Sequence, residues 1–180
     1  MKFIILCGKT SDTSLSKALI PVLERNGGGV YCSARNLVRF GAGAPEFFVF
    51  DCEKLPQMEL KNGILLFKNS FEQQEPVCVP PGFSCILESK NQHAASALQG
   101  SDAAAITCGT GAKDTLSIAA LDENTAALSL QRSIFTVDGA ILEPHDFTVA
   151  LSADLGPYRI LAVCAVLLIS GINSADGYNI

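Results

Sequence analysis

The first third of the chain consists of continuous apolar runs around one amphipathic stripe. Residues 2–7 form an apolar run that ends at Gly8, as expected of a strand buried on both faces of a parallel sheet. From Thr13 onwards, apolar residues recur at helical spacing through position 23, although Pro21 inside this stripe predicts a kink or a late start. Residues 29–33 resume as a short strand. This order of strand, loop, helix and strand predicts a parallel crossover unit.

The rest of the chain changes from continuous runs to alternation. Apolar runs predict four more buried strands, at 46–50, 63–67, 84–87 and 103–108, and a short helix is expected over 92–99. Alternating positions predict antiparallel ribbons over 114–121, 126–132 and 146–151. Residues 158–170 predict a helix that is buried nearly all round. The predicted fold is therefore α/β, one domain over residues 1–180, with a mostly parallel sheet flanked by helices and an added antiparallel ribbon in the C-terminal half.

Composition narrows the class of protein. The chain has 180 residues, 48% hydrophobic and 17% charged, which is too apolar for disorder and typical of one globular domain. Its net charge of -5 opposes a phosphate backbone, so no nucleic-acid partner is expected. The apolar run at 160–172 is shorter than the roughly 20 residues that cross a bilayer, so no membrane partner is expected either.

The cysteines indicate a reducing compartment. There are seven, an odd number without a C-x-x-C pair or a histidine at short ligand spacing, so no zinc site is predicted. Several lie in apolar runs, where a free thiol behaves as a small buried hydrophobe. The apolar run before Cys7 is too short for a signal peptide. We expect reduced, mostly buried thiols in a cytoplasmic protein.

The order of elements resembles that of a known family. The segment IILCGKTSDTSLSKALIPVLERNGGGVYCS looks like a strand, phosphate loop, helix and second strand, and EFFVFDCEKL and GILLFKNSFEQQ look like the next two strands with their loops. Together with ILESKNQ and the final GPYRILAVCAVLLISGI, this resembles the ATP-binding central domain of the Mur ligases, which join amino acids to UDP-N-acetylmuramic acid. The resemblance covers nearly the whole chain. It implies a phosphate-loop type of α/β fold and a link to peptidoglycan synthesis.

The phosphate loop that this resemblance implies is degenerate. Aligned without gaps, Gly8 keeps the first glycine, but Ser11 and Asp12 replace the last glycine and the lysine. Alternatively, Gly8, Lys9 and Thr10 match the family's G-K-T with the loop deleted, and no backbone cradle for phosphate can then form. Gly8, Lys9, Thr10 and Thr13 are therefore vestigial anion-binding candidates. The alternative is a helix cap rich in serine and threonine.

Other positions of the family's site are only partly present. Asp51 or Glu53 could stand in for the magnesium-binding glutamate that the resemblance implies, and a solvated loop acid is the alternative for either residue. Asn69 matches the family's asparagine after the strand, but residues 71–74 lack its Asp and His. Separately, the loop GTGAKD, with Lys113, has enough glycine to bind an anion by its backbone, or is a plain turn.

No catalytic residue and no cofactor are predicted. Because most of the family's nucleotide-contacting residues are missing, the resemblance favours a stand-alone, degenerate Mur-ligase-like domain that acts as a binding or partner subunit. Its partner would be an unidentified protein or a second copy of the chain. The alternative is an ATP-dependent amide-bond ligase, or a subunit of one, with an unorthodox nucleotide site completed by a partner chain. A purely structural, oligomer-forming protein is the third class.

Overall fold

The computed structural model describes all 180 residues and contains one large mixed sheet. The sheet has eleven strands in the order β13-β12-β9-β8-β7-β6-β5-β1-β4-β2-β3, and β10 and β11 form a separate hairpin. The strands are β1 (Lys2–Cys7), β2 (Gly29–Ser33), β3 (Leu37–Phe40), β4 (Phe47–Cys52), β5 (Gly63–Phe67), β6 (Phe83–Glu88), β7 (Ala104–Gly109), β8 (Leu116–Leu121), β9 (Thr125–Leu130), β10 (Ile134–Phe135), β11 (Ile141–Leu142), β12 (His145–Ala150) and β13 (Tyr178–Asn179). The helices are α1 (Ser14–Arg25), α2 (Gln92–Ala97) and α3 (Pro157–Ile169).

The sheet is parallel in its centre, and its antiparallel pairs lie outside this central part, although the edge strand β13 pairs in parallel with β12. Strands β2, β4, β1, β5, β6, β7 and β8 pair in parallel, whereas β3 pairs antiparallel with β2, and β9 pairs antiparallel with β8 and β12. The predicted class, a mostly parallel α/β sheet with an antiparallel ribbon in the C-terminal half, is confirmed.

Both faces of the central sheet are covered, which explains the continuous apolar runs. In β1, Ile4 and Leu6 belong to one core with α1 and α3, whereas Ile5 and Cys7 belong to a second core with α2. Successive side chains of a strand point to opposite faces, so a strand covered on both sides must be apolar throughout.

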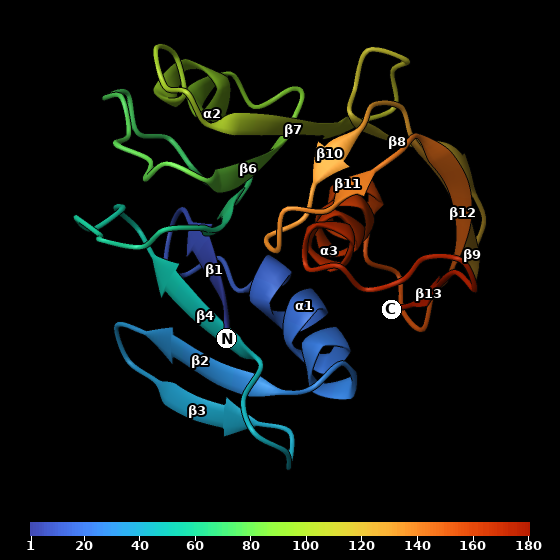
Figure 1. Ribbon diagram of the computed structural model, residues 1–180, viewed down its shortest axis with the longest axis horizontal. Helices are drawn as coiled ribbons and strands as arrows, with labels where there is room; N and C mark the ends of the chain where they lie inside the picture. Colours follow the sequence, from blue (N-terminus) through green and yellow to red (C-terminus); the bar gives the residue numbers. More distant parts are fainter.

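Helix α3 is enclosed by the rest of the molecule. Figure 1 shows the sheet curving around α1 and α3, from β3 through β6 and β7 to β12 and β13. Eleven of the 13 residues of α3 are buried, as its apolar surface predicts. No helix combines the length and the hydrophobicity needed to cross a bilayer.

Some features differ from the sequence-based expectations. Helix α1 begins at Ser14 and contains Pro21, so the late start is wrong. Strand β3 was not predicted, because it lies at the sheet edge, where Leu37 and Val38 are exposed and the strand forms no buried run. The expectation that most cysteines are buried is confirmed, since five of the seven are buried.

Candidate functional site

The loop between β1 and α1 carries four predicted anion-binding residues, and the structure divides them between two hollows. Gly8 and Lys9 line a cavity of about 410 Å³, whereas Thr10 and Thr13 line another of about 310 Å³. Gly8 is required by close packing, because a Cβ there would lie 2.7 Å from the Cβ of Lys68. The four residues therefore do not converge on one ligand position.

The side chain of Lys68 fills the inside of this loop. Lys68 directly follows β5 and is fully buried. Its Nζ donates to the carbonyl oxygens of Lys9 at 3.1 Å and Asp12 at 2.8 Å, and to Oδ1 of Asp51 at 2.6 Å. An ammonium group has three N–H donors and no acceptor, so all of its donors are used. The loop thus turns carbonyl oxygens toward a cation of the same chain.

Asp51 completes this buried ion pair. It lies on β4, is only 2% exposed, and accepts a second hydrogen bond at Oδ2 from the Tyr31 hydroxyl at 3.0 Å. The expectation of a solvated loop acid is therefore wrong for Asp51, because it lies within a buried strand. Glu53, the other metal candidate, is exposed. No group of three or more potential metal-binding side chains is present.

Asp12 occupies the N-terminus of α1. Its Oδ1 accepts from the backbone N–H and the hydroxyl of Ser14, at 3.1 and 2.6 Å, and its Oδ2 accepts from the Ser70 hydroxyl at 2.8 Å. Burial opposes ionisation, but these hydrogen bonds and the charge of Lys68 hold the pKa of Asp12 below its ordinary value. A negative charge is favourable at a helix N-terminus, so the chain supplies its own anion there.

Lys9 points away from the loop interior. Its Nζ lies 2.8 Å from the carboxylate of Glu72. This hydrogen bond and the lysine charge lower the pKa of Glu72. Thr13 is the N-cap residue of α1 but makes no side-chain capping bond. Asp12, rather than a threonine, therefore provides the side-chain acceptor at the start of α1 that the helix-cap alternative predicts.

The loop containing Lys113 is closed in the same way. The Gly111 N–H donates to the Asp114 carboxylate at 2.9 Å, and the Asp114 N–H donates to the Gly111 carbonyl at 3.0 Å. Asp114 is buried, whereas Lys113 is exposed. Here too a backbone donor, the Gly111 N–H, is bound to a carboxylate of the loop itself.

An open cleft of about 510 Å³ lies beside these closed loops. It is formed where β5, β6 and β7 end, between the first turns of α1 and α3. In open α/β sheets, ligands bind in the crevice at the carboxyl ends of the strands. Its charged and amide-bearing lining residues are Asn69, Glu88, Lys90 and Arg159.

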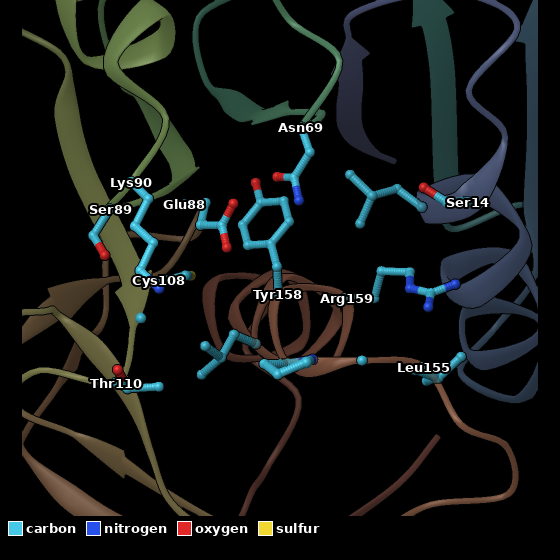
Figure 2. Close-up of a pocket in the computed structure, with 15 residues that line it drawn as sticks. Ser14, Asn69, Glu88, Ser89, Lys90, Cys108, Thr110, Leu155, Tyr158 and Arg159 are labelled. Atoms are coloured by element: carbon cyan, nitrogen blue, oxygen red, sulfur yellow. The ribbon is translucent and has the colours of Figure 1, made fainter.

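The charges in the cleft are unpaired. The ion pairs of the structure are Lys9–Glu72 and Lys68–Asp51, so Glu88, Lys90 and Arg159 have none. Figure 2 shows Glu88 beside the ring of Tyr158, Asn69 above them, and Lys90 and Arg159 on opposite sides. One carboxylate and two cations thus line a cavity of small-molecule size.

Tyr158 forms part of the cleft wall and is locked in place. It is buried, and its hydroxyl donates to the carbonyl of Phe67 at the end of β5. Burial, followed by the nearby Cys108 and Glu88, raises the pKa of Tyr158 well above its ordinary value. The hydroxyl therefore stays protonated and positions the start of α3 against the sheet.

Arg159 lies over the N-terminus of α3. The helix begins after Gly156, which has φ +72° and provides no capping side chain, and its first turn has no acidic residue. A Cβ on Gly156 would lie 3.4 Å from a guanidinium nitrogen of Arg159, so glycine keeps this approach open. Helix dipole and guanidinium together make this end of the cleft electropositive.

Sequence reasoning identified Asn69 in the cleft but missed Lys68, Glu88 and Lys90. A usable signal was present, since Lys68 follows the apolar run GILLF and Glu88 ends the buried strand FSCILE. A charge at the end of a strand buried on both faces lies at the sheet edge where parallel α/β proteins bind ligands. A scan against known protein families finds no match, and no curated protein is found to match the sequence.

Proposed function

We propose that this chain is a degenerate Mur-ligase-like domain that no longer uses ATP and acts as a binding subunit. Its binding site in this proposal is the cleft at the carboxyl ends of β5, β6 and β7. The observation that carries the proposal is the buried ammonium of Lys68, held by two carbonyls of the loop where a nucleotide phosphate would have to lie.

The chemistry of the loop opposes a triphosphate. A phosphate loop works by turning backbone N–H groups inward, at the positive end of a helix. In this loop the carbonyls of Lys9 and Asp12 point inward instead, and the Asp12 carboxylate accepts from the first backbone N–H of α1 and from the Ser14 hydroxyl. A bound phosphate would meet the charge of Asp12 and would have to displace hydrogen bonds that are already satisfied.

The cleft, unlike the loop, offers unpaired charges to a ligand. Glu88 can accept hydrogen bonds from an ammonium group, while Arg159 and the N-terminus of α3 attract a carboxylate. A volume of about 510 Å³ suits a small molecule. A free amino acid or dipeptide carries both charges, and such ligands agree with the link to cell-wall metabolism that the resemblance to Mur ligases implies.

Ligand-observed NMR tests the cleft as the binding site. The probes are free amino acids and dipeptides of both stereochemical series, added to the full chain. We expect saturation transfer to at least one probe, with loss of the signal in Arg159→Ala and Glu88→Gln. Lys113→Ala is the matched control, because Lys113 is equally charged but does not line the cleft. Binding that survives both cleft substitutions would contradict the assignment.

An ATP-turnover assay tests the loss of nucleotide chemistry. The full chain, incubated with Mg-ATP and the same probes, should release no phosphate and no ADP above the background of the buffer. Turnover that depends on a bound amino acid or dipeptide would instead support an ATP-dependent amide-bond ligase with an unorthodox nucleotide site.

A further inference from the structure

Cys7 and Cys52 are direct neighbours at the carboxyl edge of the sheet. They are the last residues of the adjacent parallel strands β1 and β4, and they are paired in register. Both belong to the same buried cluster, so both side chains lie on the same face of the sheet. Neighbouring strands are about 4.8 Å apart, within the roughly 4.4 to 6.8 Å between Cα atoms that a disulfide spans.

The pKa values of the two thiols are shifted in opposite directions. The neighbouring Cys52 thiol lowers the pKa of Cys7 below its ordinary value, against the effect of burial; the Lys68 ammonium also lowers it, and the Asp51 carboxylate opposes this. The same interaction, with burial, raises the pKa of Cys52 far above its ordinary value. Burial also raises the pKa of Cys85, to about 12. Cys7 is therefore the thiol that is activated as a nucleophile, with Cys52 beside it to form the second bond.

The residues that follow both cysteines line an open hollow. Cys7 is fully buried and Cys52 is 7% exposed, but the next residue after each, Gly8 and Glu53, lines the cavity of about 410 Å³. The Cys7 thiol also donates to the carbonyl oxygen of Glu53, with Sγ 3.8 Å away. Each cysteine is thus one residue away from the lining of an open hollow, through which we expect a small oxidant to approach.

We propose that Cys7 and Cys52 form a reversible intramolecular disulfide when hydrogen peroxide oxidises Cys7. The Cys7 thiolate attacks one peroxide oxygen, the O–O bond breaks, and the departing hydroxide takes a proton to become water. The Cys52 sulfur then attacks the resulting sulfenic acid sulfur. The S–O bond breaks, and the hydroxide leaves as water with the Cys52 proton. Two thiols and one peroxide give one disulfide and two waters.

This site is independent of the proposed ligand cleft. The disulfide would join β1 to β4 at the point where the Lys68–Asp51 pair and the loop after Cys7 begin. A cross-link across the intervening residues restricts the unfolded chain, so oxidation should shift the denaturation midpoint upward. Reduction by a dithiol should reverse the shift.

The test is peroxide treatment of the full chain, followed by denaturation, alkylation of the free thiols in the denatured state and peptide mapping. A Cys32→Ser, Cys78→Ser background removes the two cysteines that are not buried. We expect an intact mass lower by two hydrogens, one peptide pair joined through Cys7 and Cys52, and full reversal by dithiothreitol. Free Cys7 and Cys52 after treatment, or a disulfide between any other pair, would overturn the proposal.

Two substitutions distinguish the roles of the two sulfurs. In Cys52→Ser, Cys7 should stop at the sulfenic acid and be trapped by dimedone, and no disulfide should form. Cys85→Ser is the matched control, because Cys85 lies in the same cluster but should not react. Absence of a dimedone adduct on Cys7 in Cys52→Ser overturns the order of steps. The mapping of the background chain needs no change at Cys7 or Cys52, so it decides the proposal even if a variant fails to fold.

Discussion

Two neighbouring regions at the carboxyl edge of the sheet carry charged side chains, and they differ in what neutralises them. In the loop after β1, Lys68 is paired with Asp51, Lys9 is paired with Glu72, and the carboxylate of Asp12 is held by Ser14 and Ser70. In the cleft beside it, Glu88, Lys90 and Arg159 form no ion pairs. Charges satisfied within the chain stabilise the fold, whereas unpaired charges around a cavity are available to a ligand.

The largest expected effect comes from breaking the buried pair. Lys68→Met leaves the Asp51 carboxylate buried without its cation, which typically costs about 3 to 5 kcal/mol of unfolding free energy. Urea denaturation measures the loss. Lys9→Met is the matched control, because it removes a lysine from an exposed ion pair and should leave the midpoint unchanged. Equal midpoints for the two variants would show that the buried pair does not hold the loop.

The enclosure of α3 predicts a second large effect. Leu161→Ala removes a side chain that is 1% exposed, which typically costs about 2 to 5 kcal/mol. Leu37→Ala, on the exposed edge strand β3, is the control and should leave the denaturation curve in place. A Leu161→Ala curve that overlays the parent would reject the buried helix and the packing that forms one wall of the cleft.

Asp12 gives a smaller, pH-dependent effect. Its folded pKa lies below the ordinary value of 3.8, so the charged form stabilises the fold above that pH, and this contribution disappears as the pH falls through the folded pKa. Asp12→Ala should therefore cost about 1 kcal/mol at pH 7, as for loss of a helix cap. The measurement is a pair of denaturation curves for the parent and Asp12→Ala, one pair at pH 7 and one at strongly acidic pH. A difference from the parent that stays constant down to strongly acidic pH would contradict the role of the carboxylate charge.

The smallest effect separates binding from stability. Arg159 makes no ion pair, so Arg159→Ala should change the unfolding free energy by less than about 0.5 kcal/mol. The same substitution is expected to abolish binding of the amino-acid or dipeptide probe. A large loss of stability in Arg159→Ala would show that the guanidinium belongs to the folded scaffold rather than to a ligand site.

Most of the sheet could be predicted because strands that are buried on both faces form continuous apolar runs in the sequence. The runs at 2–7 and 63–67 match β1 and β5 residue for residue. The hairpin of β10 and β11 could not be predicted in the same way, since Phe135 and Ile141 point to solvent and each strand has only two residues.

The candidate site was harder to predict because it depends on strand order. Asp51 lies one residue before the end of β4 and Lys68 directly follows β5, but they face each other only because β4 and β5 flank β1. Glu88 and Arg159 line the same cleft because α3 packs against β5, β6 and β7. Periodicity gives the type of each element, whereas these juxtapositions come from how the elements pair and pack.

Calorimetric titration of the full chain with Mg-ATP tests the central claim most directly. If Lys68 and Asp12 fill the loop as the chain's own cation and anion, no binding tighter than millimolar should be measured. Saturable binding of Mg-ATP at micromolar concentration would contradict the account, because it would require the loop to release those contacts in favour of a phosphate.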